Sequence, residues 1–298
     1  MRATRLPGSF RDPAGHVFIA DGTLYRHISP VGRDAYQRLM QSGLYSALVS
    51  DGLLLPHEEV EPSNGDTVIR PERVPMVSYP YEWCFSQLRD AALLTLRVQR
   101  TALRFGMSLK DATAYNVQFH RGRPVLIDTL SFETRIEGRP WVAYRQFCQH
   151  FLSPLALMAH RDVRLGQLSR VFLDGVPLDL ASELLPRRTR LKSSLAIHVH
   201  LHAWAQRRYA HRPGPAPARR RTLSETGLVG LVGSLRRAIE SLRSIPRSTE
   251  WSEYYDETNY SEAALAEKEQ RIATIIDRLR PATVWDLGSN TGRFSRVA

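Results

Sequence analysis

The first part of the chain alternates short apolar runs with segments of helical spacing. Residues 16–29 contain two apolar runs separated by Asp21-Gly22, a pair typical of a tight hairpin turn. Residues 33–51 place apolar side chains three and four positions apart, which predicts a helix with a break at Gly43. Strand-like runs follow at residues 53–55, 67–69 and 76–79. A hairpin, then a helix, then strands predicts an α+β domain.

A long amphipathic helix and a second hairpin come next. Residues 80–105 carry an apolar stripe on one side and arginines on the other. Residues 117–119 and 125–127 are strand-like, and the five residues between them include a glycine and a proline, which favour a turn. We therefore expect a rigid helix that leads through a short loop into a hairpin.

Three polar side chains flank this second hairpin. Asp111 precedes it, Asn116 comes directly before its first strand, and Asp128 directly follows its second strand. Because the strands fold back on each other, we expect Asn116 and Asp128 at the same end. Carboxylate and amide oxygens that converge there suit a hard cation and a hydroxyl nucleophile. The alternative is that these side chains only cap turns.

The arrangement resembles the catalytic loop of protein-kinase-like phosphotransferases, which include small-molecule kinases of the aminoglycoside and choline type. The resemblance implies a catalytic base at Asp111, magnesium ligands at Asn116 and Asp128, and Mg-ATP as co-substrate. Two parts of the pattern are missing. No lysine precedes Lys110, so Arg26 is the nearest substitute for the cation that contacts the nucleotide phosphates, and no glycine-rich phosphate loop is visible. These gaps favour a non-catalytic kinase-like domain, with an active kinase as the alternative.

The middle of the chain is mostly helical and ends in a basic linker. His198 and His202 would share a helix face, but no acidic residue accompanies them, so hydrogen-bonded structural histidines are preferred over a metal site. Residues 207–221 combine prolines with arginines and predict a solvated linker. Residues 224–243 place leucines on one face of a helix. We expect this helix to dock on a neighbouring domain; binding to a membrane surface is the alternative.

Composition and charge change this interpretation little. The net charge is +11, yet almost all of the positive charge is arginine without interleaved aromatic residues, so no nucleic acid partner is expected. Cys84 and Cys148 match no metal or redox spacing, which fits a reducing compartment. No apolar signal sequence and no stretch of membrane-spanning length is visible. We expect a cytoplasmic protein, and its oligomeric state stays open.

A new unit begins after residue 247. Ser261 is a typical N-cap for a helix that continues to Arg280, and Pro281 stops it. Residues 283–287 are a short apolar run that predicts a buried strand, and a glycine-rich turn follows directly. Strand, glycine turn and helix start are the opening of a Rossmann-like unit. Its glycines permit a tight turn and close approach of the backbone to a ligand.

This turn resembles the first motif of class I S-adenosylmethionine-dependent methyltransferases, in which an acid at the strand end is followed by Gly-x-Asn-x-Gly. The resemblance implies that Gly288, Asn290 and Gly292 shape the pocket for the methionine part of the cofactor, and that Asp286 steadies the loop. Together with the kinase-like part and the arginine-rich linker, it makes the chain similar to a bacterial, nodulation-protein-like group of these enzymes.

The sequence therefore predicts three parts. They are an α+β protein-kinase-like domain at residues 1–206, an Arg/Pro-rich linker with an amphipathic helix at 207–247, and the first helix and strand of a Rossmann-like α/β methyltransferase domain at 248–298. A methyltransferase sheet needs more strands than follow Gly292, so we expect a C-terminally truncated enzyme that is inactive alone. The expected function is methyl transfer from S-adenosylmethionine to an acceptor that the sequence does not identify. The kinase-like domain would recognise or position that acceptor.

Overall fold

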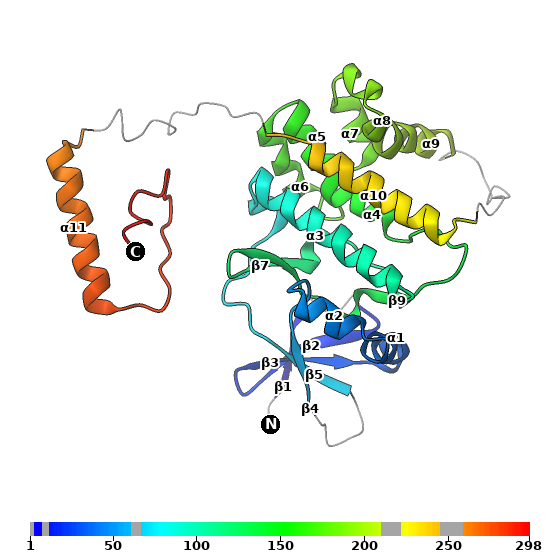
Figure 1. Cartoon of the computed structure of the whole chain (residues 1–298), viewed down its shortest axis with the longest axis horizontal. Helices are drawn as coiled ribbons and strands as arrows, with labels where there is room; N and C mark the ends of the chain where they lie inside the picture. Colours follow the sequence, from blue (N-terminus) through cyan, green and yellow to red (C-terminus); the bar gives the residue numbers. More distant parts are fainter. Residues whose placement is uncertain (1–2, 8–11, 61–66, 210–221, 245–258) are drawn as a thin grey trace. The chain divides into compact units, whose positions relative to one another are not determined.

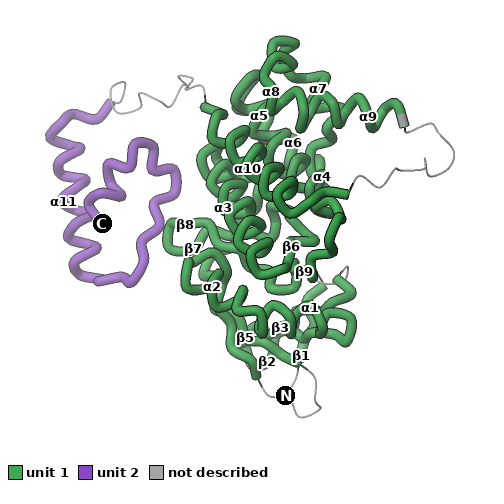
Figure 2. The backbone as a smooth tube through the Cα atoms, turned by 45° about the vertical axis from the view of Figure 1, so that its right-hand side comes forward, with its two compact units in different colours: residues 1–244 green, residues 245–298 purple. Residues whose placement is uncertain are grey.

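The computed structural model describes residues 3–7, 12–60, 67–209, 222–244 and 259–298. The chain divides into two compact units, Met1–Ser244 and Ile245–Ala298 (Figure 2). The amphipathic helix predicted at 224–243 therefore falls within the first unit. The predicted boundary at 247–248 and residues 210–221 of the predicted linker lie outside the described residues.

Unit 1 begins with a five-stranded antiparallel sheet in the order β1-β2-β3-β5-β4 (Figure 1). Its strands are β1 (Ala3–Arg5), β2 (Gly15–Ala20), β3 (Thr23–Ile28), β4 (His57–Val60) and β5 (Thr67–Pro71). Asp21 and Gly22 both have positive φ and form the predicted two-residue turn between β2 and β3. The sheet thus confirms the first predicted hairpin.

Two helices connect β3 to β4. They are α1 (Pro30–Gln41) and α2 (Leu44–Ser50), and Gly43 separates them in a left-handed conformation with φ 82°. Tyr36 of α1 packs with Ile28 and Ile69 of the sheet and with Leu130 from the second half of the unit. This small core joins the sheet to the segment that carries Asp128.

Two predicted strands do not form. At residues 53–55 the chain makes only an isolated bridge, Leu54 with Leu126, although all three leucines are buried. Residues 76–79 are irregular and run into a 3-10 turn, η2 (Pro80–Glu82), with Met76 and Val77 exposed. Short apolar runs do not distinguish a strand from a buried or irregular connection. The long helix predicted within residues 80–105 follows this turn.

The long helix α3 (Phe85–Arg104) is the central element of the second half of unit 1. Its predicted stripe is buried, from Leu88 to Ala102, and Gly106, with φ +70°, follows its end. Two small antiparallel pairs come after it: β6 (Met107–Leu109) with β9 (Phe132–Thr134), and β7 (Val117–His120) with β8 (Arg123–Leu126). The β7–β8 hairpin is the second predicted hairpin, and a 3-10 turn flanks it on each side, η3 (Ala114–Asn116) and η4 (Thr129–Ser131).

Helices complete unit 1. In chain order they are α4 (Tyr144–Phe147), η5 (Cys148–Leu152), α5 (Ser153–His160), η6 (Val163–Gln167), α6 (Leu168–Val171), α7 (Leu178–Leu184), η7 (Arg187–Leu191), α8 (Ser193–Leu195), η8 (Ala196–Leu201), α9 (His202–Tyr209) and α10 (Glu225–Ser241). α10 packs along α3, as Figures 1 and 2 both show, which confirms that the amphipathic helix docks on its neighbour. His198 of η8 links α4 to α10, because its ring nitrogens contact Tyr144 Oη at 2.7 Å and Ser234 Oγ at 2.9 Å.

The order of elements in unit 1 is the one that the kinase-like resemblance implies. A five-stranded sheet with helices after its third strand is followed by a long helix, a polar loop, a hairpin and a largely helical remainder. Within the described part of the chain, none of the helices combines the length and the apolarity that a bilayer crossing needs.

Unit 2 contains the helix α11 (Glu262–Leu279). Ser261 Oγ accepts a hydrogen bond from the Ala264 amide, as predicted for the N-cap, and Arg280 ends the helix in a left-handed conformation. The predicted strand at 283–287 does not form, and Trp285 and Leu287 are exposed. A strand is stable only when it pairs with another, and the described residues of unit 2 include no second strand.

Candidate functional site

The polar residues predicted around the hairpin meet a side chain from the sheet. Arg26 lies on β3, in register with Val17 of β2 and Ile69 of β5, so it occupies the middle of the sheet. Its side chain reaches the segment after β8, where Asp128 caps the 3-10 turn η4. The site is therefore built from two regions that lie 102 residues apart in the sequence.

Arg26 makes two ion pairs. Its Nη1 lies 2.5 Å from Asp128 Oδ1, and its Nη2 lies 2.5 Å from Asp12 Oδ2. The side chains of Arg26 and Asp128 are only 15% and 17% exposed, so water screens their attraction weakly. The guanidinium group thus holds the sheet, the segment before β2 and the segment after the hairpin together.

Asp128 accepts two further hydrogen bonds. Its Oδ1 accepts from the Leu130 amide at 3.0 Å, and its Oδ2 accepts from Ser131 Oγ at 2.5 Å. Ser131 Oγ in turn accepts from Asn116 Nδ2 at 2.9 Å. The structure therefore brings Asn116 and Asp128 to the same end of the hairpin, as predicted, and connects them through a serine that the sequence analysis did not identify.

Asp111 belongs to the same loop but not to this network. Its Oδ1 accepts from the Thr113 amide at 3.0 Å and so caps a turn. Among the described residues it makes no hydrogen bond or ion pair with Asn116 or Asp128. The loop is anchored from the helical side, where Gln146 Oε1 accepts from the Ala112 amide at 2.7 Å. The alternative that the polar residues cap turns thus describes the observed contacts of Asp111.

A buried histidine contacts the loop that follows Asp111. The His150 ring lies 3.3 Å from Thr113 Oγ1 and packs edge-on against Tyr115. Burial lowers the pKa of His150 to about 4, with the nearby Asp174 carboxylate opposing the shift. The ring is therefore neutral at physiological pH and acts as a hydrogen-bonding support for the loop.

The arrangement does not fit a magnesium ion. Mg²⁺ requires free oxygen ligands at about 2.0–2.1 Å. Both carboxylate oxygens of Asp128 already accept hydrogen bonds, and a guanidinium charge lies beside one of them. The described residues also hold no cluster of three acidic, histidine or cysteine side chains suited to a metal. A cation at Asn116 and Asp128 would also be repelled by the Arg26 guanidinium group.

A buried side chain that the sequence pattern did not single out holds the segment between β5 and α3 in place. Gln118 of β7 is 4% exposed. Its Oε1 accepts from the Ser78 amide and its Nε2 donates to the Ser78 carbonyl, both at 2.9 Å. The backbone groups of Ser78 are thus satisfied internally rather than presented to a ligand. The available signal was a polar residue between two apolar ones in a short strand.

The predicted cofactor loop lies in unit 2. Gly288, Asn290 and Gly292 all have positive φ, at 76°, 49° and 75°. A Cβ on Gly288 would meet no heavy atom within 4 Å, so backbone conformation rather than crowding favours glycine there. Asp286 Oδ2 accepts from Ser295 Oγ at 2.6 Å and so closes the loop. All four predicted residues therefore lie on one tightly curled segment.

Comparison with known proteins identifies one informative relative. The chain is 33% identical to the nodulation protein NoeA of Rhizobium meliloti (strain 1021) over 312 aligned residues, which cover 100% of this chain and 64% of that protein. The chain thus spans less than two thirds of its curated relative. This match confirms the predicted similarity to nodulation-protein-like sequences. It does not address the methyltransferase class. No family model matches the chain.

Solved structures of a kinase domain are also similar to the chain. A double mutant of the PknI kinase domain from Mycobacterium tuberculosis superimposes with a TM-score of 0.42 at 14% identity, covering 79% of this chain and 94% of that domain. Another structure of the same domain gives a TM-score of 0.38 over the same coverage. A likeness of this kind concerns the fold and says nothing about activity.

Proposed function

We propose that this chain is part of an S-adenosylmethionine-dependent methyltransferase. The observation that carries the proposal is the loop 286–292, whose acid, glycines and asparagine match the motif and whose backbone follows a left-handed turn. Gly288, Asn290 and Gly292 would hold the methionine part of the cofactor, and Asp286 would keep the loop closed. The cofactor supplies the methyl group, whereas these residues bind and orient it.

The kinase-like part takes a non-catalytic role in this proposal. Arg26, the nearest substitute for the lysine that the kinase pattern expects, is bound to Asp128. At the effective dielectric constant typical of partly buried pairs, two unit charges at 4 Å attract by about 4 kcal/mol. A metal ion at Asp128 would compete with this interaction and with two hydrogen bonds. Unit 1 is therefore suited to recognise or position the methyl acceptor rather than to transfer phosphate.

The proposal is tested by calorimetric titration of the gene product, at its full encoded length, with S-adenosylmethionine. A matched pair of variants separates the loop from the fold. Gly288→Val places a β-branched residue at positive φ within the loop, and Gly22→Val does the same in the sheet turn, where a Cβ is equally free of contacts. We expect the first variant to abolish binding and the second to retain it. Equal binding by both would contradict the proposal.

A further inference from the structure

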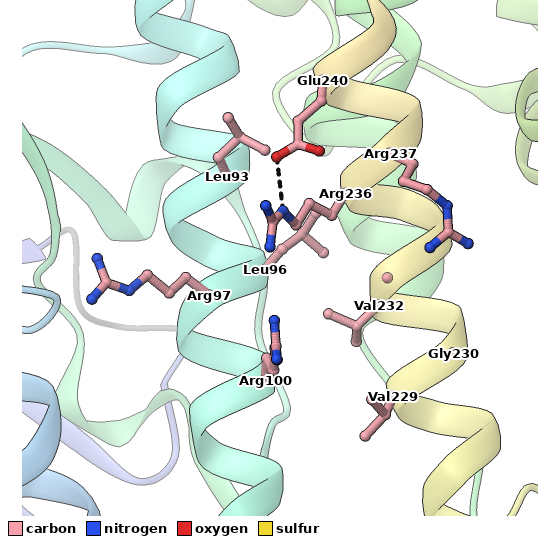
Figure 3. Close-up of a pocket in the computed structure, with 11 residues that line it drawn as sticks. Leu93, Leu96, Arg97, Arg100, Val229, Gly230, Val232, Arg236, Arg237 and Glu240 are labelled. Carbon is pink, nitrogen blue, oxygen red and sulfur yellow. Dashed lines mark hydrogen bonds and ion pairs between the residues drawn. The ribbon is translucent and has the colours of Figure 1, made fainter.

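Helices α3 and α10 leave a groove between them with a volume of about 710 Å³ (Figure 3). Its apolar lining comes from Leu93 and Leu96 of α3 and from Val229 and Val232 of α10. Leu96 and Val232 are 1% and 2% exposed, so they form an apolar floor. The polar lining residues are Arg97, Arg100, Arg236, Arg237 and Glu240. An apolar floor below a basic rim suits an amphiphilic anion.

Two of these arginines carry charge that the described residues do not neutralise. Arg236 Nε donates to Glu240 Oε1 at 2.7 Å, and Arg97 Nη2 donates to Asp51 Oδ2 at 3.1 Å. Arg100 and Arg237 have no hydrogen-bond or ion-pair partner among the described residues. In Figure 3 Arg100 lies between the helices, whereas Arg237 points away from α3. Because both side chains are exposed, rotation about their side-chain bonds is free to bring them to a ligand.

Glycines on α10 provide a second observation. Gly230 and Gly233 line the groove in the interior of the helix, where glycine is about 1 kcal/mol less favourable than alanine. Packing does not require them. A Cβ on Gly230 would meet no heavy atom within 4 Å, and a Cβ on Gly233 would meet only Arg237 Nη1, at an ordinary 3.6 Å. Without side chains at these two positions, the backbone of α10 is accessible from the groove.

We propose that this groove binds the phosphate monoester of a small organic molecule. Such a group carries a charge of about −1.5 to −2 at pH 7, which matches the two unpaired guanidinium groups. Arginine is suited to phosphate because its planar fork donates two parallel hydrogen bonds. The organic part lies on Leu96 and Val232. Among the described residues no aromatic side chain lines the groove, so they offer no stacking platform for a single-stranded nucleic acid.

This inference does not depend on the methyltransferase proposal. The groove belongs to unit 1, and the cofactor loop belongs to unit 2. Failure of S-adenosylmethionine binding would leave the groove untouched. Failure of phosphate-ester binding would equally leave the loop 286–292 as it stands.

The test is calorimetric titration of the chain with phenyl phosphate, inorganic phosphate and phenol at low ionic strength. We expect phenyl phosphate to bind at least about tenfold more tightly than inorganic phosphate, because its ring covers the apolar floor, and phenol not to bind measurably. Equal affinities for the two phosphates would overturn the proposal, since they would show attraction to charge alone.

Variants with a matched control locate the site. Changing Arg100 and Arg237 together to glutamine removes two charges from the groove and should weaken phenyl phosphate binding by about tenfold or more. Changing Arg187 and Arg188 together to glutamine removes two exposed charges that do not line the groove, and should have little effect. An equal loss in both double variants would contradict the assignment.

A third variant fills the groove without removing charge. Gly230→Leu should reduce phenyl phosphate affinity by at least about tenfold while the thermal midpoint stays the same or rises, because leucine favours the helix. Unchanged affinity in this variant would refute the proposed location.

Discussion

Replacing Arg26 by methionine tests the contact that organises unit 1. The substitution keeps most of the side-chain length and removes the guanidinium group. Asp12 and Asp128 would then be left without their cation, and the Asp128 side chain is only 17% exposed. Deleting one partner of a fully buried pair costs about 3–5 kcal/mol. Because this pair is partly exposed, we expect a loss of about 2–3 kcal/mol in the free energy of unfolding.

The assay is urea denaturation followed by circular dichroism, with Arg70→Met as the matched control. Arg70 pairs with Glu58 on the exposed surface of the same sheet, and exposed pairs contribute little. A double-mutant cycle with Asp128→Asn isolates the pairwise interaction, and we expect a coupling of at least about 1 kcal/mol. If Arg26→Met is no more destabilising than the control, or the cycle is additive, the pair does not organise the site.

Three further predictions concern other parts of unit 1. Burial lowers the pKa of His198 to about 4, below its unfolded value near 6.5, so the folded state binds fewer protons between these limits. The free energy of unfolding should therefore fall as the pH drops from 6.5 to 4. His198→Gln should flatten this dependence in acid denaturation curves. An unchanged slope in the variant would show that His198 does not cause the pH dependence. Gln118→Leu should cost about 2–4 kcal/mol in urea denaturation, because the amide and carbonyl of Ser78 lose their partner, whereas a neutral result would show that water replaces it. Millimolar Mg²⁺ should leave the thermal midpoint of the unaltered chain unchanged and raise that of Arg26→Met, in which Asp128 has lost its ion pair. A shift in the unaltered chain would contradict the claim that the contacts of Asp128 exclude Mg²⁺.

Local patterns in the sequence predicted much of the fold. The Asp21-Gly22 turn, the buried stripe of α3 and the Ser261 cap all depend on residues close together in the chain. The hairpin that brings Asn116 near Asp128 is equally local, since its two strands are adjacent in the sequence. The amphipathic pattern of α10 showed that one face is buried, although not which helix covers it.

The remaining features depend on contacts between distant segments. Arg26 stood out in the sequence only as a substitute for a missing lysine, and nothing local indicated that it binds Asp128. The apolar run around Leu54 indicated burial. It did not indicate that Leu54 forms an isolated bridge rather than part of a strand. Residues 283–287 have a strand pattern but lack a partner strand among the described residues. A pattern predicts how a segment can fold, whereas its pairing depends on the rest of the protein.

Methyl transfer and phosphate transfer require different cofactors, and a binding experiment distinguishes them. The gene product at its full encoded length is titrated by calorimetry with S-adenosylmethionine and, in a parallel experiment, with Mg-ATP. We predict saturable binding of S-adenosylmethionine and no binding of Mg-ATP, because the loop 286–292 carries the cofactor motif while Asp128 is held by Arg26. Binding of Mg-ATP without binding of S-adenosylmethionine would show that the proposed function is wrong.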